Sequence, residues 1–571
     1  MYLSLARVDP RLLGKVAFSA AALASAAYVL WLGRGQTLIL DEWSYLLDSR
    51  SWSPAKLLEP HNGHLILFPT LVLKLMYETV GIASHLPYQL LAVLLNTLIA
   101  ALVYVFARRS VGPLVALVPA ILILFCGAGW DAFVTGYQLP NLFGMAAGLL
   151  AVLFVRREDL RGDVLTCLAL SLSLASFSVG VAFAAGIAVA LLLRGRDAAL
   201  RRAWVVLVPG ILYAAWFVWA TRFGGAEVTA HNVGALLSGM LDQLAAVSSG
   251  LTGLAATPGG GDLAAAAARP KWGPTLVVLA IVGVALALRG RRPSSSFVVA
   301  LTVLLVYLAT IALALGGSRV PDASRYVYLG SVLTLLVLVE AVHGMRPTKG
   351  WAIGLMIALA FSLLANGMLM GEGGKVVRLE SATNRAQLGA LEIARDRAPG
   401  DFIVESGEQT TMSNPDMLFD ARAYFDVTKS FGSPAYSEDE LEGAPEQARE
   451  VADLLLARAL PVSVRGDFHP TAGAPIAVHE GHFARRSGGC VVLGPKSNSE
   501  ALVTFTVPSR GLSYSVAATE QPELKLRRFG EGFAVVPDLP LGPARVAIPT
   551  DRSARAWEAE LVTGSRLELC P

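Results

Sequence analysis

Two adjacent carboxylates, Asp41 and Glu42, follow directly on the end of the first apolar stretch of the chain. Acidic side chains beside an apolar run are costly unless they cap a helix, pair with a cation or take part in chemistry. In one interpretation, Asp41 caps a helix and Glu42 stabilises its first turn. In the other, a partly desolvated carboxylate becomes basic enough to take a proton from a hydroxyl group.

Two histidines lie further along the same polar segment. His61 and His64 are three residues apart, which places them on one face if the segment is helical. They are candidates to donate hydrogen bonds to an anionic phosphate, or to bind a divalent metal together with the acids. A pair of histidines satisfied within the fold is an equally good interpretation. No metal is therefore assigned, and a divalent metal stays an alternative.

A later polar loop contributes two arginines, Arg319 and Arg325, and Tyr326 begins the apolar run after it. The planar guanidinium fork fits phosphate oxygens, so both arginines are candidate phosphate ligands. Arginines at the start of a membrane span can instead extend to the lipid headgroups. Tyr326 is also typical of the aromatic belt at a membrane surface.

A third loop combines aromatic and polar side chains: Trp130, Asp131 and Gln138. Together with Tyr326, these residues are candidates to contact an acceptor or a sugar. Anchoring at the membrane surface explains the aromatic side chains equally well.

The elements that position these residues are apolar. The chain has 571 residues, of which 54% are hydrophobic and 16% charged, and its mean hydropathy is +0.55. Soluble domains carry about 25% charged residues, so a soluble enzyme is disfavoured. Eleven apolar runs approach the length needed to cross a bilayer: Val16–Leu32, Leu86–Phe106, Pro113–Cys126, Leu142–Val155, Val164–Phe177, Val179–Leu193, Ala203–Ala220, Thr275–Leu288, Phe297–Leu315, Tyr326–Val342 and Trp351–Met370.

The basic residues predict how these spans are oriented. With eleven spans, every Lys/Arg cluster between them falls on the side of the N-terminus, which the positive-inside rule assigns to the cytoplasm. A twelfth span over Leu65–Val80 would reverse this, so we expect an interfacial helix there. We favour an uncleaved anchor over a signal peptide for the first span, because its apolar run continues to Trp31. Asp41 and the loops described above then face outward.

Residues 371–571 are acidic where residues 1–370 are basic, and they read as a separate extracytoplasmic domain. Helical character over Ala382–Arg397 and Ser437–Ala459 gives way from about residue 475 to short alternating runs, as in an antiparallel β-sandwich. We therefore expect a polytopic α-helical membrane protein of about eleven spans with a C-terminal α+β domain. Cys490 and Cys570 are compatible with a disulfide on the oxidising side, and two free thiols are the alternative.

The sequence contains no phosphate-binding glycine-rich loop with Lys-Ser/Thr and no Asp-x-Asp motif. ATP-driven transport and nucleotide-sugar chemistry are therefore disfavoured. Few acids and bases lie deep in the apolar runs, which disfavours proton-coupled transport.

The first 370 residues resemble the GT-C superfamily of integral-membrane glycosyltransferases, which use polyprenyl-phosphate sugars. The resemblance rests on Asp41-Glu42 after the first span, on Arg325-Tyr326 at a late span, and on His61-Asn62-Gly63-His64, which is similar to bacterial relatives of protein mannosyltransferases and lipid-sugar transferases. The C-terminal domain resembles the sandwiches of bacterial arabinosyltransferases.

This resemblance implies inverting transfer of a sugar to an acceptor hydroxyl on the outer face of the plasma (inner) membrane of a bacterium. Asp41 would be the general base and Glu42 would orient it or the donor. Arg325, with Arg319 or a histidine, would hold the donor phosphate. The implied partners are a polyprenyl-phosphate donor, membrane lipids and a glycan, lipid or protein acceptor, with no nucleic acid. The alternatives are a flippase or other transporter of lipid-linked saccharides, and a glycan polymerase or ligase.

Overall fold

The protein is described here by a computed structural model, which describes residues 9–48, 50–224, 230–255, 272–316, 319–345, 348–404, 419–460, 463–465, 476–487, 490–496, 499–507, 512–517, 521–536, 541–547 and 550–570. The chain forms two compact units. One takes in the chain up to Gln36, Leu40–Val80 and His85–Arg378, and the other takes in Thr37–Ile39, Gly81–Ser84 and the chain from Leu379 onward.

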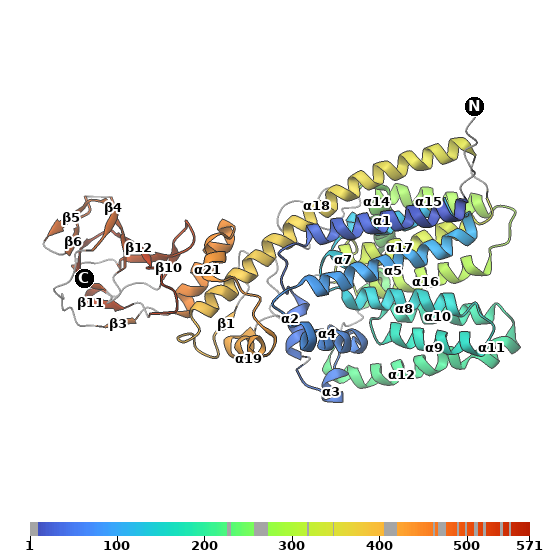
Figure 1. Ribbon diagram of the computed structural model, residues 1–571, viewed down its shortest axis with the longest axis horizontal. Helices are drawn as coiled ribbons and strands as arrows, with labels where there is room; N and C mark the ends of the chain where they lie inside the picture. Colours follow the sequence, from blue (N-terminus) through green and yellow to red (C-terminus); the bar gives the residue numbers. More distant parts are fainter. Residues whose placement is uncertain are drawn as a thin grey trace, which may run out of the picture. The chain divides into compact units, whose positions relative to one another are not determined.

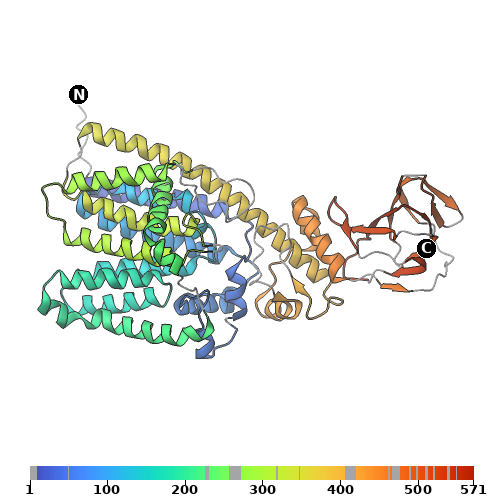
Figure 2. The ribbon, with the colours of Figure 1, turned by 180° about the vertical axis from the view of Figure 1, so that it is seen from behind.

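The first unit is helical, and its long helices run side by side (Figures 1 and 2). Its elements are α1 (Pro10–Leu32), α2 (Asp41–Asp48), α3 (Pro54–Leu57), α4 (Leu67–Val80), α5 (Leu86–Val111), α6 (Leu117–Leu124), η1 (Gly127–Gly129), α7 (Asp131–Val134), α8 (Leu139–Phe154), α9 (Leu160–Leu174), α10 (Val179–Leu192), α11 (Arg196–Arg202), α12 (Trp204–Ala220), η2 (Thr221–Phe223), α13 (Ala230–Gly234), α14 (Leu236–Thr252), α15 (Gly273–Leu288), α16 (Ser295–Leu313), α17 (Ser324–Ala341) and α18 (Lys349–Ile393).

Local sequence signals start several of these helices. Pro10 opens α1, and the Asp9 carboxylate before it accepts a hydrogen bond from the Arg11 amide at 2.9 Å. Asp159 caps α9 through the amide of Gly162 at 2.7 Å. These side chains satisfy amide groups that have no partner within the helix, which fixes where each apolar helix begins.

Each of the eleven predicted runs lies on a helix, but the helices differ in length. Within the described residues, six are long and apolar enough to cross a membrane: α1, α5, α12 with η2, α16, α17 and α18. Three shorter apolar helices are α8, α10 and α15. The run over Pro113–Cys126 folds into α6, which has only 8 residues. The protein therefore has several apolar helices of spanning length, and the number of eleven spans stays a prediction.

Helix α14 packs against α16 and α17, and Gln243 on α14 donates to the Leu308 carbonyl at 3.1 Å. Gly250 permits the close approach to α17, because a Cβ there would lie 3.1 Å from the Cγ1 of Val327. The glycine-rich stretch Pro258–Asp262 lies outside the described residues.

The second unit combines helices with antiparallel sheets. Its elements after α18 are β1 (Ile403–Val404), β2 (Phe419–Asp420), α19 (Ala421–Phe431), α20 (Glu438–Glu442), α21 (Glu446–Ala459), β3 (Ser463–Arg465), β4 (Val478–His482), β5 (Ala484–Ser487), β6 (Cys490–Leu493), β7 (Ala501–Thr506), β8 (Leu512–Ala517), β9 (Glu523–Arg527), β10 (Ala534–Val535), β11 (Gly542–Ala547), β12 (Glu558–Thr563) and β13 (Arg566–Cys570). The predicted boundary at residues 370/371 falls inside α18, which is continuous there, and the division into two functional domains stays a prediction.

The strands form two larger sheets. Their orders are β10-β9-β12-β7-β4 and β3-β11-β8-β13-β6-β5, beside a small β1-β2 ribbon. Buried residues alternate with partly exposed ones along β7 and β12, and Leu561 pairs with Val503 in the register between them. The strands are present at the C-terminal end, as the alternating runs predict, and a sandwich packing of the sheets stays a prediction.

A disulfide joins the last strand to β6, since Cys490 and Cys570 are bonded with an S–S length of 2.05 Å. The alternative of two free thiols is thereby excluded in this structure. The bond closes a loop of 80 residues within the sheets.

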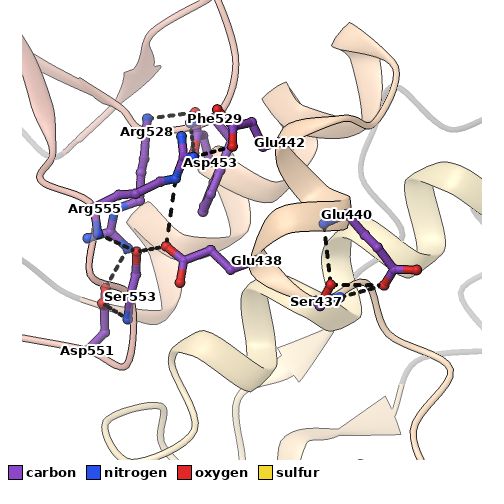
Figure 3. A network of polar contacts seen from close by, with 10 residues as sticks. All are labelled: Ser437, Glu438, Glu440, Glu442, Asp453, Arg528, Phe529, Asp551, Ser553 and Arg555. Carbon is purple, nitrogen blue, oxygen red and sulfur yellow. Dashed lines mark hydrogen bonds and ion pairs between the residues drawn. The ribbon is translucent and has the colours of Figure 1, made fainter.

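Buried charges tie the helices of this unit to its strands (Figure 3). Asp453 on α21 accepts the backbone amides of Arg528, Phe529 and Gly530 at 2.8–3.1 Å. The Arg528 guanidinium pairs with Asp551 at 2.8 Å, and both side chains are almost fully buried. One carboxylate thus satisfies three amides of a tight turn that would otherwise be left without partners.

Figure 3 also shows the start of α20, where Ser437 and Glu440 form a capping box. Glu438 in the same helix accepts a hydrogen bond from Ser553 at 2.5 Å. Arg555 pairs with Glu442 at the end of that helix. These contacts hold the segment before β12 against α20.

Candidate active site

The carboxylate of Asp41 stands at the first position of α2. The residue before it, Leu40, has a φ of 50°, a left-handed backbone conformation that residues other than glycine rarely adopt. The Leu40 carbonyl accepts the Trp43 amide at 3.1 Å, which begins the helix. Successive helical residues point about 100° apart, so Asp41 and Glu42 face different surroundings. The side chain of Asp41 is 22% exposed and that of Glu42 only 4%.

Glu42 points into the protein, where it meets His85. Its carboxylate lies 2.6 Å from the imidazole Nε2 of His85, which is 2% exposed. A glycine is needed opposite this pair, because a Cβ at Gly136 would lie 2.1 Å from the Glu42 oxygen. Glu42, which was expected to orient Asp41 or the donor, is therefore a buried carboxylate in contact with the histidine at the start of α5.

Asp41 points instead toward His61. The His61 Nε2 lies 3.5 Å from the Asp41 carboxylate, and its ring packs edge-on to Tyr45, with 4.8 Å between centroids. His61 and His64 exchange backbone hydrogen bonds of 3.0 and 2.9 Å. The two histidines thus belong to a tight turn and not to a helix, and Asn62 in this turn has a φ of 49°.

Arg319 is held against the same turn. Its guanidinium donates to the Asn62 carbonyl at 3.1 Å, while the Arg319 amide and carbonyl exchange hydrogen bonds with Gly316. A segment far along the chain is thereby brought to the histidine turn with its positive charge. The loop that carries Arg319 therefore contacts the histidine turn.

Arg325 lies close enough to Asp131 to act on its carboxylate electrostatically. The Asp131 amide is bonded to the Ser324 hydroxyl at 3.3 Å, so α7 and the start of α17 are joined. The Tyr137 hydroxyl donates to the Asp131 Oδ2 at 3.2 Å, and the Tyr45 hydroxyl donates to the Tyr137 carbonyl at 3.1 Å. A chain of contacts therefore runs from α2, which carries Asp41, to Asp131.

The burial of these groups sets their protonation. Burial raises the pKa of Asp131 to about 6, against the opposing effect of the Arg325 guanidinium and of hydrogen bonds from Ser324 and Tyr137. Burial also lowers the pKa of His64 to about 3, and the positive charges of Arg319 and Arg325 add to this effect. His64 is therefore neutral near pH 7, and it can offer a phosphate a hydrogen bond but no charge.

Asp41 and Arg325 act on the same neighbours. Both interact electrostatically with the imidazole of His64 and with the hydroxyl of Tyr137. Arg319 and His61 act on His64 as well. The structure thus gathers a carboxylate and two guanidinium groups from three separate segments around one histidine turn.

Two other predicted residues lie inside the fold. Trp130 is fully buried, and a Cβ at Gly373 would lie 2.3 Å from its ring. Gln138 is buried and accepts a hydrogen bond from Asn141. Neither presents an open surface to a ligand. Tyr326 is partly exposed, and its ring lies 5.0 Å from the Arg325 guanidinium.

Three residues of the site carry no distinctive sequence pattern. His85 is a single histidine before an apolar run, and its role follows only from its contact with Glu42. Tyr45 and Tyr137 are aromatic residues of polar segments, where belt anchoring is the common role. Their pairing depends on two loops meeting in space, which no local pattern encodes.

The residues around Asp41 make a poor site for a metal cation. Asp41 and His61 supply two donors, fewer than the three or four that zinc sites use, and two guanidinium groups lie close by. Among the described residues, the cluster with metal-ligand spacing is Cys490, Glu568 and Cys570, whose two sulfurs are joined in the disulfide.

No family model and no curated protein matches the sequence. Two solved structures of ArnT from Cupriavidus metallidurans are similar to this chain, one bound to undecaprenyl phosphate and one in the apo state. The first is 12% identical, covers 74% of this chain and 89% of its own, and has a TM-score of 0.43. For the second, these values are 13%, 75%, 90% and 0.44.

At this identity and TM-score, no residue role is transferred from ArnT to this chain.

Proposed function

We propose that the protein is a membrane glycosyltransferase that moves a sugar from a polyprenyl-phosphate donor to an acceptor hydroxyl. The observation that carries the proposal is that Asp41 and two guanidinium groups, those of Arg319 and Arg325, all act electrostatically on His64 in the His61–His64 turn. A base near cationic groups is what transfer from a sugar phosphate requires.

In the proposed reaction, the Asp41 carboxylate takes the proton of the acceptor hydroxyl. The hydroxyl oxygen attacks the anomeric carbon from the face opposite to the phosphate, and the bond between that carbon and the phosphate oxygen breaks. The product is a glycoside of inverted configuration, and polyprenyl phosphate leaves with the electron pair of the broken bond.

The leaving phosphate gains negative charge as this bond breaks, and Arg325 and Arg319 are the cations placed to stabilise it. Arg319 is oriented by its hydrogen bond to the Asn62 carbonyl. His64, which is neutral, can donate one hydrogen bond to the same phosphate. His61 contacts the proposed base, since its Nε2 lies 3.5 Å from the Asp41 carboxylate. We therefore assign it to orienting Asp41 and not to binding the phosphate.

The proposed site faces the outer side of the plasma membrane. Support comes from the basic clusters, such as Arg108/Arg109 at the end of α5 and Arg201/Arg202 at the end of α11, which are typical of cytoplasmic segments. His85 lies at the start of α5, so the Glu42–His85 pair beside Asp41 is at the end of α5 away from those arginines.

The test is transfer in membranes that contain the full chain. A panel of mannosyl-, glucosyl- and arabinosyl-phosphate polyprenols is supplied, and the release of polyprenyl phosphate is measured. We expect Asp41→Asn to lower the rate by about 10²–10⁴-fold, the usual contribution of a general base. Arg325→Gln is expected to lower it by about 10²–10³-fold, as for the loss of an oxyanion-stabilising group.

The matched control is Asp48→Asn. Asp48 lies on the same helix, is exposed, and pairs with Lys56 at 3.2 Å. It is expected to keep the wild-type rate. A rate for Asp41→Asn within twofold of the control, at equal protein level, would remove Asp41 from the mechanism.

A further inference from the structure

A cavity lies between the helices of the first unit. It has a volume of about 150 Å³, and much of its lining is apolar, with Leu149 from α8, Phe183 from α10, Val303 from α16 and Leu333 from α17. An apolar cavity of roughly 150 Å³ stays dry and takes up a hydrocarbon when one is offered. This space is therefore suited to an apolar ligand.

The cavity is remote from Asp41. Helix α17 begins beside the proposed site with Arg325 and reaches the cavity with Glu340, about 22 Å further along its axis at 1.5 Å per residue. Helix α10 follows the same course, since Phe177 just before it packs on His64 and Arg194 just after it lines the cavity. The two sites thus lie at opposite ends of the same helices, as two leaflets of a bilayer require.

Charged groups ring the cavity. Both oxygens of Glu340 accept hydrogen bonds from serine hydroxyls, from Ser110 at 3.0 Å and from Ser294 at 3.4 Å. The Arg156 guanidinium donates to Ser296 at 3.2 Å, stacks on Phe106 at 5.0 Å and interacts with Glu340. Glu340 is thus engaged on every oxygen, and the balance of charge at the cavity is positive.

Arg194 is the second cation of this ring. Its Nη1 is buried and has no hydrogen-bond partner among the residues that the structure describes. Its nearest acid is Glu158, 3.9 Å from Nε, and that side chain is 78% exposed. A buried guanidinium nitrogen without an acceptor costs free energy unless a ligand supplies one.

We infer that this cavity binds an anionic phospholipid of the leaflet opposite to Asp41. One acyl chain enters the apolar cavity, and the phosphate accepts hydrogen bonds from Arg156 and from the open Nη1 of Arg194. A free phosphate would satisfy the arginines but leave the apolar space empty, and a lipid without a phosphate, such as a diacylglycerol, would do the reverse. An anionic lipid satisfies both, and basic residues at a membrane surface attract such headgroups.

The test counts lipids bound to the purified full-length protein by native mass spectrometry. The protein in neutral detergent is supplied with phosphatidylglycerol, with a diacylglycerol or with inorganic phosphate. We expect one phosphatidylglycerol to be retained tightly. Arg156→Gln/Arg194→Gln is expected to weaken its binding by about thirtyfold, the effect of losing two cations near the membrane surface. Its control is Arg196→Gln/Arg201→Gln, two exposed arginines of α11.

A second variant tests the acyl chain. Ala300 lines the cavity, so Ala300→Phe fills it, whereas Ala285→Phe adds the same ring on an exposed face of α15. Ala300→Phe is expected to abolish retention and Ala285→Phe to keep it. Equal retention by Ala300→Phe and wild type, or binding of inorganic phosphate that Ala300→Phe leaves unchanged, would overturn the inference. The release of polyprenyl phosphate is measured on every variant as well. Failure of the lipid-binding inference can then be distinguished from failure of the proposed transfer reaction.

Discussion

The imidazole of His61 lies 3.5 Å from the carboxylate of Asp41, although twenty residues separate them in the chain. The His61–His64 turn is held by its own backbone hydrogen bonds and by Arg319 at the Asn62 carbonyl. The position of the proposed base relative to the proposed phosphate site is therefore set through one short turn. This relationship gives the first of five predictions.

Replacing His61 is expected to slow transfer without weakening donor binding. His61→Phe keeps the ring against Tyr45 but removes the nitrogen beside Asp41. A misplaced catalytic group costs about 10²-fold in rate, so we expect kcat to fall by roughly that factor while the donor KM stays within threefold. The conservative His61→Gln is expected to recover part of kcat. A normal kcat for His61→Phe would show that His61 does not orient the base.

Asp131 is expected to make transfer depend on pH. Burial raises the pKa of this carboxyl to about 6, so it is ionised above that pH and protonated below it. The ionised form attracts Arg325, which keeps the guanidinium in place. We expect kcat/KM to fall as the pH drops through about 6, and Asp131→Asn to lack this step. An identical pH profile for Asp131→Asn would contradict the assignment.

The same carboxyl is expected to lower the stability of the protein at neutral pH. Because its pKa is higher in the folded state than the ordinary value of 3.8, its contribution to stability is full below pH 3.8 and is lost as the pH rises through about 6. Asp131→Asn should therefore raise the melting temperature at pH 8, by the equivalent of at most about 3 kcal/mol. The gain should shrink toward zero near pH 4.

The buried Glu42–His85 pair is expected to be essential to the first unit. His85→Ala removes the imidazole that contacts the buried Glu42 carboxylate, a change that costs about 3–5 kcal/mol. Thermal unfolding in detergent would show a large drop in melting temperature. The double variant Glu42→Leu/His85→Leu removes both polar side chains and should recover most of the loss. A double variant no more stable than His85→Ala would argue against a stabilising contact between the two side chains.

In the second unit, Asp453 is expected to matter more than the helix cap near it. Asp453→Ala leaves three amides without acceptors, at about 1–3 kcal/mol for each. Ser437→Ala removes one cap, at about 1 kcal/mol. Hydrogen exchange at residues 528–530 should become much faster in Asp453→Ala and stay unchanged in Ser437→Ala.

The sequence predicts most of the fold wherever one pattern dominates. The apolar runs are helices, and the alternation along Ala501–Val507 and Glu558–Leu561 is that of β7 and β12, each with one buried face. The patterns fail where a strand has no buried side. β4 and β5 are mostly exposed along their length, so their sequences carry no alternation. The sequence does not predict α19, a helix of 11 residues, because glycine and proline residues typical of loops lie close to it in the chain.

Several residues of the candidate site could be selected from the sequence, but the directions in which their side chains point could not. Asp41, His61, Arg319 and Arg325 could be selected because charged side chains beside apolar runs are unusual. That Glu42 turns inward to His85 depends on the phase of α2, and that Trp130 is buried depends on Gly373 in a distant helix. Such facts belong to packing between elements, which a single sequence does not specify.

Leu40, the residue with a left-handed backbone before Asp41, makes the length of the chain critical at this point. Two like carboxylates stand side by side, and only the angular setting of α2 decides which one is solvated and which is locked to a histidine. Adding or deleting one residue at Leu40 would rotate α2 by about 100° and exchange their surroundings. Many loops tolerate insertions and deletions. Here the number of residues before α2 decides which of the two carboxylates faces His61 and which faces His85.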